Sequence, residues 1–512
     1  MKVMLFGRDG ALRRQTEAEL GQRGIVVGDS TPDCVICLDP GRAREAASLG
    51  GLKRLVLRSH AYVYGSNAKN PGLMTEDRVS LLPANAPEQR WLQAEEAALQ
   101  FPNTAVIRLT SLLDPEEGDL IVKQISGSMG ISLAGFNPSV QFISVRDAAR
   151  ALASAAQSEA TGIFNAAGEG AIPLNKLFRA AGTTRISLPG GVKRQAMQFN
   201  WTVSGEKAER ELGFKPDQST VEALAEFLGR KSGSRPDLLA KSYDDYGLDT
   251  DYIRAWGWWF EFVRKVYWRI ELEGMENVPQ TGAAMYVSNH RGFIPIDAVM
   301  HLHLLFTERG RIPRFLIIPS LLRTPYMCNF LTKLGGVIAS QENAARLFKK
   351  GELIGIFPEG IRGTFTPYKR TYKLRDFAKS AFAKIAIENQ VPIIPSAVIG
   401  HSEIFPIIGR IDSSLVVKEL GWPYFPIAPP FPLSPIPIPS KWHVRVLPPV
   451  GMQGLKPADA ENEKLVRDFS RHIQAIVQTN IDDMLSRRKS IFWGKVLTVA
   501  APPAPQFRFR TP

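Results

Sequence analysis

Short apolar runs alternate with helical patterns through the first 228 residues of the chain. Four of the runs have the length of strands, at 3–6, 34–38, 55–57 and 105–109. The segments R-Q-T-E-A-E-L at 14–20 and V-R-D-A-A-R-A-L-A-S-A at 145–155 have the patterns of helices. Strands that alternate with helices in this way predict a parallel sheet with crossover helices.

A polar, basic stretch rich in glycine, G-R-K-S-G-S-R-P-D at 229–237, follows this region. Such a composition is typical of a linker, and we place one at 229–250. A second domain is predicted over 251–485, and residues 486–512 form a basic tail that contains aromatic side chains. The 512 residues exceed the usual size of one hydrophobic core, which agrees with this division.

Aromatic residues alternate with Arg and Lys in Y-I-R-A-W-G-W-W-F-E-F-V-R-K-V-Y-W-R-I, 252–270. Two interpretations stay open: the helix covers a core, or it lies among lipid headgroups, where Trp, Tyr and cations are favoured. S-R-R-K-S-I-F-W-G-K at 486–495 repeats the pattern and is a second candidate contact.

The formal charge of +13 and the pI of about 9.6 favour anionic partners. No zinc-finger spacing or RNA-binding motif occurs, so we expect no nucleic-acid partner. The longest uncharged stretch, between Glu419 and Lys441, contains prolines that prevent a continuous membrane-crossing helix. The N-terminal apolar run is too short for a signal peptide. We therefore expect a cytoplasmic protein that associates peripherally with the cytoplasmic face of a membrane.

The chain has three cysteines, which are too few for a disulfide framework and suit a reducing compartment. Cys34 and Cys37 form a C-x-x-C, but they lie in the apolar run C-V-I-C-L, which predicts a buried strand. No second cysteine pair completes a site, so we expect neither a metal nor a redox centre.

G-R-D-G, residues 7–10, follows the first predicted strand, where a dinucleotide pyrophosphate meets a helix N-terminus in Rossmann-like folds. Gly7 and Gly10 are the candidate cofactor-binding residues, although Arg13 stands where a third glycine is expected. Further segments, at 58–65, 105–113, 142–152, 162–168 and 208–216, occur in the order found in the NAD-dependent epimerase/dehydratase family. The first 228 residues resemble that family.

The departures from that family bear on chemistry. The Tyr and Lys that transfer protons in the family are replaced by Pro87 and Trp91, which cannot exchange a proton at neutral pH. Ser59 and Tyr64 remain, with packing at a strand end as their simplest role. We expect a degenerate domain that is not an oxidoreductase, in which NAD(P) binding is doubtful. Retention of a nucleotide or sugar cleft, or a purely scaffolding role, stays open.

Four segments of the second half follow one another at intervals of some tens of residues: S-N-H-R-G-F-I-P-I-D (288–297), 319–340, L-I-G-I-F-P-E-G-I-R-G (353–363) and V-P-I-I-P-S-A-V-I-G (391–400). This ordered set resembles the four blocks of the glycerolipid acyltransferase family, which includes the 1-acylglycerol-3-phosphate acyltransferases. The resemblance covers about residues 255–485. It implies an α/β domain with a mixed sheet flanked by helices.

The resemblance implies that His290 and Asp297 are catalytic. An imidazole can take the proton of an alcohol that attacks a thioester, and a carboxylate on the other ring nitrogen fixes the tautomer. Glu359, Gly360 and Arg362 are implied to bind the acceptor through a hydroxyl, a close backbone approach and a phosphate. The donor is acyl-CoA or an acyl-carrier protein, and no metal or further cofactor is required.

Two departures bear on the substrate. R-G-F-I-P-I separates His290 from Asp297, where four residues are usual, and Pro295 predicts a loop that carries Asp297 back beneath His290. This insertion, with P-S-K-W at 439–442, also resembles a subgroup related to diacylglycerol acyltransferases. A-S-Q-E-N at 339–343 replaces an Arg that often follows the second block, which weakens the case for a phosphorylated acceptor.

We predict a peripheral membrane acyltransferase that moves a fatty acyl group from acyl-CoA to a hydroxyl of a glycerolipid. Lysophosphatidic acid, other lysophospholipids and diacylglycerol all remain candidate acceptors. Two alternatives stay open: a sugar-nucleotide or NAD-binding epimerase-like protein, and a non-catalytic membrane-binding scaffold.

Overall fold

The computed structural model describes residues 1–28, 31–189, 197–239, 242–377, 381–430 and 436–497. It forms two compact units, Met1–Asp249 with Thr324–Thr332, and Thr250–Arg323 with Lys333–Pro512. We call them the N-terminal and C-terminal units. They divide at the end of the proposed linker, 229–250, and nothing in the sequence indicated that Thr324–Thr332 belongs to the first unit. Parts of the proline-rich stretch (431–435) and of the tail (498–512) lie outside the described residues.

The N-terminal unit is built on a six-stranded sheet in the order β10-β5-β4-β3-β1-β2. Every pair of neighbours is parallel, so the predicted parallel sheet is confirmed. Its side chains alternate between two cores: Cys34 and Ile36 enter one, and Val35 and Cys37 enter the other. The strands are β1 (Lys2–Phe6), β2 (Val26–Val27), β3 (Cys34–Cys37), β4 (Arg54–His60), β5 (Thr104–Leu109) and β10 (Gly162–Ala166).

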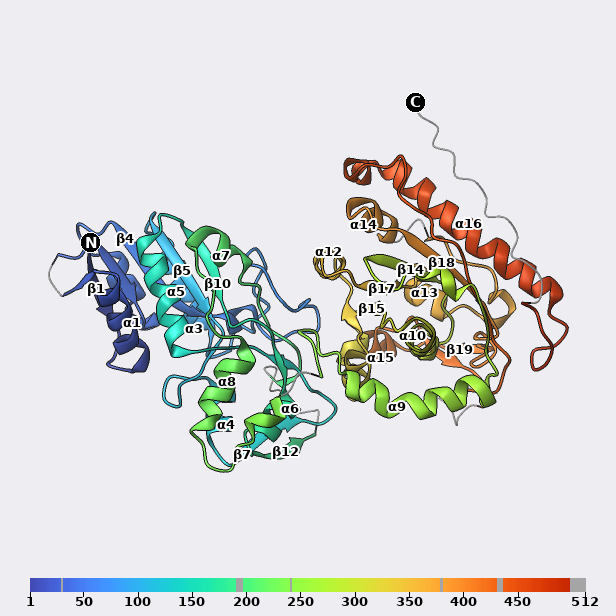
Figure 1. Cartoon of the computed structure of the whole chain (residues 1–512), viewed down its shortest axis with the longest axis horizontal. Helices are drawn as coiled ribbons and strands as arrows, with labels where there is room; N and C mark the ends of the chain where they lie inside the picture. The colour runs from blue at the N-terminus through green and yellow to red at the C-terminus, as the bar shows by residue number, and fades with distance from the viewer. Residues whose placement is uncertain (29–30, 190–196, 240–241, 378–380, 431–435, 498–512) are drawn as a thin grey trace. The chain divides into compact units, whose positions relative to one another are not determined.

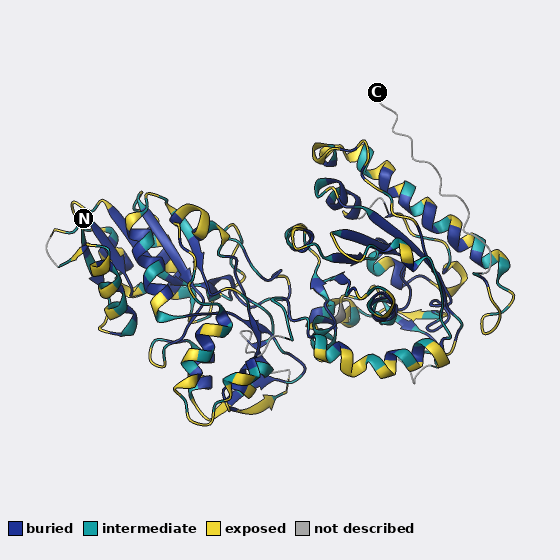
Figure 2. Ribbon diagram, viewed as in Figure 1, coloured by how far each residue is buried: buried dark blue, intermediate teal, exposed yellow. Residues whose placement is uncertain are grey.

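Helices cover both faces of this sheet, whose strands are largely buried (Figure 2). Helices α1 (Ala11–Gln22) and α5 (Val145–Gln157) share one core, and α2 (Ala43–Ala47) and α3 (Gln89–Ala98) share the other. This is the doubly wound arrangement typical of crossover connections. The remaining elements of the unit are β6 (Ser111–Leu112), α4 (Leu120–Ser126), β7 (Met129–Leu133), β8 (Ser139–Val140), β9 (Phe142–Ile143), β11 (Ile172–Pro173), α6 (Leu174–Ala180), β12 (Thr184–Leu188), α7 (Glu206–Leu212) and α8 (Thr220–Gly229).

The C-terminal unit holds a seven-stranded sheet in the order β13-β21-β18-β14-β17-β15-β16. β18 and β21 pair antiparallel and the other neighbours pair parallel, so the predicted mixed sheet is confirmed. The strands are β13 (Glu271–Glu273), β14 (Ala284–Ser288), β15 (Arg314–Ile317), β16 (Val337–Ile338), β17 (Leu353–Ile356), β18 (Ile393–Ile399) and β21 (His443–Val446).

Helices flank this sheet as well (Figure 1). Ile394 and Val398 of β18 share a core with α10 (Ile296–Arg309), whereas Ala397 and Ile399 pack with α16 (Glu463–Arg487). No helix among the described residues is long and apolar enough to cross a membrane. The other elements of this unit are α9 (Thr250–Phe262), α12 (Gln341–Lys349), α13 (Gly360–Thr364), α14 (Phe382–Glu388), β19 (Gly409–Ile411), α15 (Ser414–Leu420) and β20 (Phe425–Ile427). Helix α11 (Met327–Lys333) belongs to the N-terminal unit except for its last residue.

Candidate active site

The chain segments after β14 and β17 emerge at the same edge of the C-terminal sheet. These strands are parallel neighbours, with Val287 opposite Ile356. The residues that follow each strand, which include His290 and Glu359, are therefore brought together although they lie far apart in sequence. Ligand sites in α/β sheets form at this carboxyl edge.

His290 and Asp297 form a buried pair. Nδ1 of His290 lies 2.6 Å from Oδ2 of Asp297, and the Asp297 side chain has no exposed surface. The same Oδ2 accepts the backbone N–H of Arg291 at 3.0 Å. Burial alone would raise the pKa of Asp297, but the charge of His290 and the hydrogen bond to it outweigh burial and hold that pKa below its ordinary value.

The local sequence explains how the chain reverses between the two residues. Gly292 has a φ of +87°, a conformation that glycine adopts without strain. Pro295 then precedes the first residue of α10, so the predicted loop ends there and Asp297 lies in the first turn of the helix. A carboxylate at that position is stabilised by the helix dipole.

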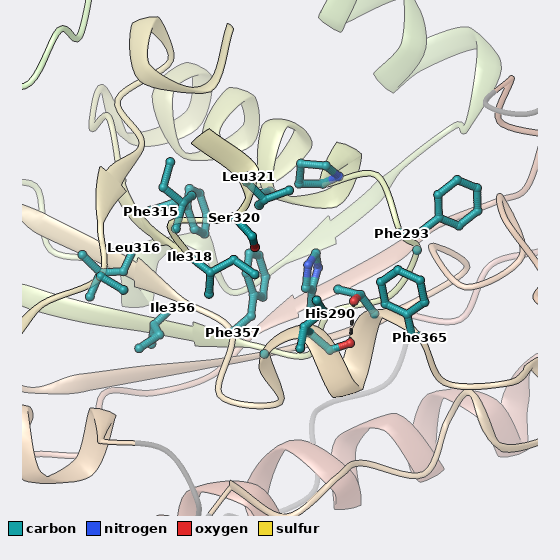
Figure 3. Close-up of a pocket in the computed structure, with 18 of the residues that line it drawn as sticks. His290, Phe293, Phe315, Leu316, Ile318, Ser320, Leu321, Ile356, Phe357 and Phe365 are labelled. Carbon is teal, nitrogen blue, oxygen red and sulfur yellow. Dashed lines mark hydrogen bonds between the residues drawn. The ribbon is translucent and has the colours of Figure 1, made fainter. Parts of the chain in front are cut away.

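The imidazole of His290 faces an apolar cavity of about 240 Å³ (Figure 3). The ring of Phe357 stacks on it, with centroids 4.4 Å apart and planes at 19°. Because Asp297 accepts a hydrogen bond from Nδ1–H, the lone pair of Nε2 is left free to act as a base. Nε2 has no hydrogen-bond partner within the part of the chain that the structure describes. Other apolar residues that line the cavity include Phe293, Phe315, Ile318, Leu321, Phe365 and Trp422.

Arg291 and Glu359 fasten the segment that carries His290. The Arg291 side chain is 1% exposed and the Glu359 side chain is fully buried. Nη1 of Arg291 donates to Oε2 of Glu359 and to the carbonyl of His290, both at 2.6 Å, and Nε donates to the carbonyl of Thr371. The other oxygen of Glu359 accepts the backbone N–H of Arg375 at 2.7 Å. We call this arrangement the arginine clamp.

The clamp changes the interpretation of Glu359. The family resemblance implied that this residue binds the acceptor, but the structure encloses its carboxylate between Arg291 and the backbone of Arg375. With no exposed surface, Glu359 lies beneath the site and positions the His290 segment.

Gly360 and Arg362, the two other predicted binding residues, differ in their relation to the cavity. Gly360 lines the cavity with a φ of +53°, and open space surrounds the position of a Cβ. Arg362 is exposed and does not line the cavity. The basic segment 368–377 follows α13, and its cations are also exposed: Lys369, Arg370, Lys373 and Arg375.

Two further histidines lie buried near the pair of His290 and Asp297, which we call the dyad. Nδ1 of His301 is 2.9 Å from the hydroxyl of Tyr286, and Nε2 of His401 is 3.3 Å from Nδ2 of Asn289. Burial lowers the pKa of His301 to about 4 and that of His401 to about 3, against the opposing charge of Asp297. Both rings are therefore neutral at neutral pH. No group of three potential metal ligands occurs among the described side chains.

Comparisons with known proteins now bear on this site. The family model described as Acyltransferase matches residues 269–399, which contain the dyad and the clamp. The uncharacterized protein Rv0502 of Mycobacterium tuberculosis is 30% identical over 289 residues, covering 54% of this chain and 79% of that protein. The chain belongs to the acyltransferase family. The human protein named "DGAT1/2-independent enzyme synthesizing storage lipids" is 28% identical over 166 residues, 32% of this acyltransferase and 50% of that protein.

Solved structures give likenesses in fold alone. MoeE5 in complex with UDP-glucose and NAD has 18% identity and a TM-score of 0.37, over 45% of the acyltransferase and 98% of that chain. UDP-N-acetylglucosamine 4-epimerase from Bacillus cereus has 15% identity and a TM-score of 0.37, over 44% and 98%.

The carboxylate of Glu117 lies at the start of α1 in the N-terminal unit. Gly7 and Gly10 lie in the β1–α1 turn, as predicted, but a Cβ on Gly10 would lie 2.1 Å from Oε1 of Glu117. The same oxygen accepts the backbone N–H of Leu12, in the first turn of α1, at 3.3 Å. A carboxylate of the protein therefore occupies the helix N-terminus where a pyrophosphate would bind.

The polar side chains left in the N-terminal unit bind one another. Ser59 donates to Glu95, whose other oxygen accepts Nη2 of Arg108 at 2.6 Å. The hydroxyl of Tyr64 donates to Oδ1 of Asn165 at 2.9 Å, and burial raises the pKa of Tyr64. Trp91 is buried on α3. Ser59 and Tyr64, the two family residues that remain, are therefore both engaged in hydrogen bonds within the unit.

Sequence reasoning missed the clamp and the buried histidines. Arginine is usually a surface residue, so the sequence next to His290 did not mark Arg291 as buried. The apolar run before Glu359 predicts a buried carboxylate, and a buried carboxylate needs a cationic partner. His401 had no local partner in sequence, and the parallel pairing of β14 and β18 supplies Asn289.

The free energy of unfolding of the C-terminal unit is expected to fall as the pH decreases from about 6.5 toward about 4. His301, His401 and His443 have pKa values lowered by burial to about 4, about 3 and about 4, whereas the unfolded chain binds these protons near pH 6.5. Each contributes a slope of up to about 1.4 kcal/mol per pH unit. Urea unfolding across this range measures it, and His401→Asn should flatten the slope. An unaltered slope in that variant would contradict the assignment.

Glu359→Gln is expected to destabilise the protein by about 3–5 kcal/mol, because it leaves the buried charge of Arg291 without its counter-ion. The matched control is Glu463→Gln, in the exposed pair that Glu463 forms with Arg467 at 3.1 Å. That change should cost about 0.5 kcal/mol or less. Equal shifts of the urea midpoint in the two variants would show that the buried ion pair contributes no more to stability than the exposed one.

Proposed function

We propose that the C-terminal unit transfers a fatty acyl group from acyl-CoA to a hydroxyl of a glycerolipid, with His290 as general base. One observation carries the proposal: buried Asp297 holds one ring nitrogen of His290 at 2.6 Å while the imidazole faces an apolar cavity. A base at the mouth of an apolar cavity suits a reaction in which one partner is a hydrocarbon chain.

The reaction needs one proton relay. Nε2 of His290 takes the proton of the acceptor hydroxyl as its oxygen attacks the thioester carbonyl carbon. The tetrahedral intermediate collapses, the carbon–sulfur bond breaks, and the imidazolium returns the proton to the departing thiolate. Asp297 stabilises the imidazolium between these steps and keeps the ring in one orientation. The products are an ester and a free thiol, and no acyl-enzyme forms.

Exposed cations near the site support an anionic donor. Arg291 binds the carbonyl of Thr371, so the segment that follows Tyr368 is held against the dyad segment. Its exposed lysines and arginines, with Arg362, can bind the phosphates of coenzyme A.

The acceptor is proposed to be a neutral glycerolipid such as diacylglycerol. The name of the human relative, which refers to the synthesis of storage lipids, supports this choice. The segment A-S-Q-E-N at 339–343, which lacks the arginine common in the family, also supports it. Lysophosphatidic acid is the acceptor against which it has to be tested.

His290→Gln and Asp297→Asn are each expected to lower acyl transfer about a thousandfold or more, because the base or its orientation is lost. Transfer of radiolabelled palmitoyl-CoA to diacylglycerol, lysophosphatidic acid and lysophosphatidylcholine measures it and names the acceptor. The matched control is His472→Gln on α16, which should keep full activity. Full activity in His290→Gln would end the proposal.

The N-terminal unit is expected not to bind NAD, since the carboxylate of Glu117 would repel a pyrophosphate at the start of α1. Titration of the whole chain with NADH, followed by fluorescence, should give no saturable signal. Tight NADH binding by the wild-type protein would restore the epimerase-like alternative.

A further inference from the structure

Helix α9 and the π-helical turn that follows it, Val263–Tyr267, carry apolar side chains on two faces. The inner face packs in the unit through Ile253, Phe260 and Val263, which are all buried. A helix at a protein surface usually presents polar residues on its outer face. The outer face of α9 is instead aromatic, and much of the helix is exposed (Figure 2).

Four exposed apolar residues lie on one side of the helix. Trp258 and Phe262 are four residues apart, Val266 is four further on, and Trp259 adjoins them, a spacing that places side chains on a common face. Their exposed fractions are large: 72% for Trp258, 41% for Trp259, 43% for Phe262 and 57% for Val266. Exposure on this scale is costly in water unless something covers the patch.

A segment near the end of the described chain extends this patch. The guanidinium of Arg269 lies 4.8 Å from the ring centroid of Trp493, and its Nη2 donates to the carbonyl of Phe492 at 3.0 Å. Nη1 of Arg269 donates to the carbonyl of Val266. The two basic aromatic segments of the sequence therefore meet. We call the combined patch the aromatic face: Trp258, Trp259, Phe262, Val266, Phe492 and Trp493.

Cations border the aromatic face. The side chains of Arg254 and Lys265 on the helix are 67% and 69% exposed. Lys489 and Lys495, on either side of the second segment, are exposed as well. Asp251 and Glu261 offset the two helix cations, so the excess of positive charge comes from Arg269 and the tail.

We propose that the aromatic face docks the C-terminal unit on the surface of a lipid bilayer that contains anionic lipid. Indole rings favour the headgroup level, and lysine and arginine beside them meet lipid phosphates. A protein partner fits less well, because lysine is depleted at protein interfaces. This surface lies outside the dyad and its cavity, so docking does not depend on the acyl transfer proposed above.

The test compares vesicle binding by the whole chain and by the triple variant Trp258→Ser/Trp259→Ser/Phe262→Ser. Sedimentation with vesicles of phosphatidylcholine and phosphatidylglycerol should show binding by the wild type and a loss of at least about a hundredfold in the variant. The matched control, Val79→Ser/Met129→Ser, removes side chains that are 81% and 64% exposed elsewhere and should bind as the wild type does. Circular dichroism checks that each variant is folded.

Equal binding by the folded triple variant would overturn the proposal, and so would the absence of binding by the wild type. Lys489→Gln/Lys495→Gln should weaken binding to the anionic vesicles and leave binding to pure phosphatidylcholine vesicles unaffected. If the triple variant instead loses self-association in size-exclusion chromatography with vesicle binding intact, the face binds a second copy of the chain and the proposal is wrong.

A further arm separates docking from catalysis. With short-chain, water-soluble acyl-CoA and acceptor, the triple variant should retain turnover. His290→Gln should lose turnover and keep vesicle binding. Loss of both properties in the folded triple variant would show that the aromatic face acts on the dyad rather than on lipid.

Discussion

The ion pair of Arg291 and Glu359 is the constraint on which the dyad depends. A guanidinium with 1% exposure costs several kcal/mol unless its donors are bonded, and here a carboxylate and three backbone carbonyls accept from them. One of those carbonyls belongs to His290 itself. A different backbone path at 290–291 would leave the buried charge of Arg291 without partners. The ion pair therefore fixes the backbone at His290, and Asp297 orients the imidazole ring. The position of the His290 imidazole thus depends on a buried ion pair that does not line the cavity.

The fold was accessible from sequence wherever the signal is local. The apolar run at 3–6 became β1 (Lys2–Phe6) and that at 105–109 became β5 (Thr104–Leu109), because a strand buried on both faces requires an unbroken apolar run. The pairing of His290 with Asp297 followed from a motif and a proline. Arg291 was missed because its partners, Glu359 and the carbonyl of Thr371, come from segments that only the sheet brings near. The helix at 252–270 was left with two interpretations, since periodicity does not tell which of two apolar arcs faces the core.

The N-terminal unit satisfies its buried polar groups with its own side chains. Its glycines still make the β1–α1 turn, yet the helix N-terminus is satisfied by Glu117, and Ser59 and Arg108 are satisfied by Glu95. Buried polar groups must find partners whether or not a ligand comes. When the partners are side chains of the same unit, the polar cluster becomes part of the core.

The alternation of β3 has a practical result. Cys34 and Cys37 are three residues apart, so their side chains enter different cores on opposite faces of the sheet, and both are fully buried. Burial raises the pKa of each thiol to about 12, which leaves almost no thiolate at neutral pH. Neither thiol can be alkylated, nor the two joined, until the sheet opens. The rate at which Cys34 and Cys37 are modified therefore reports how often the N-terminal unit unfolds.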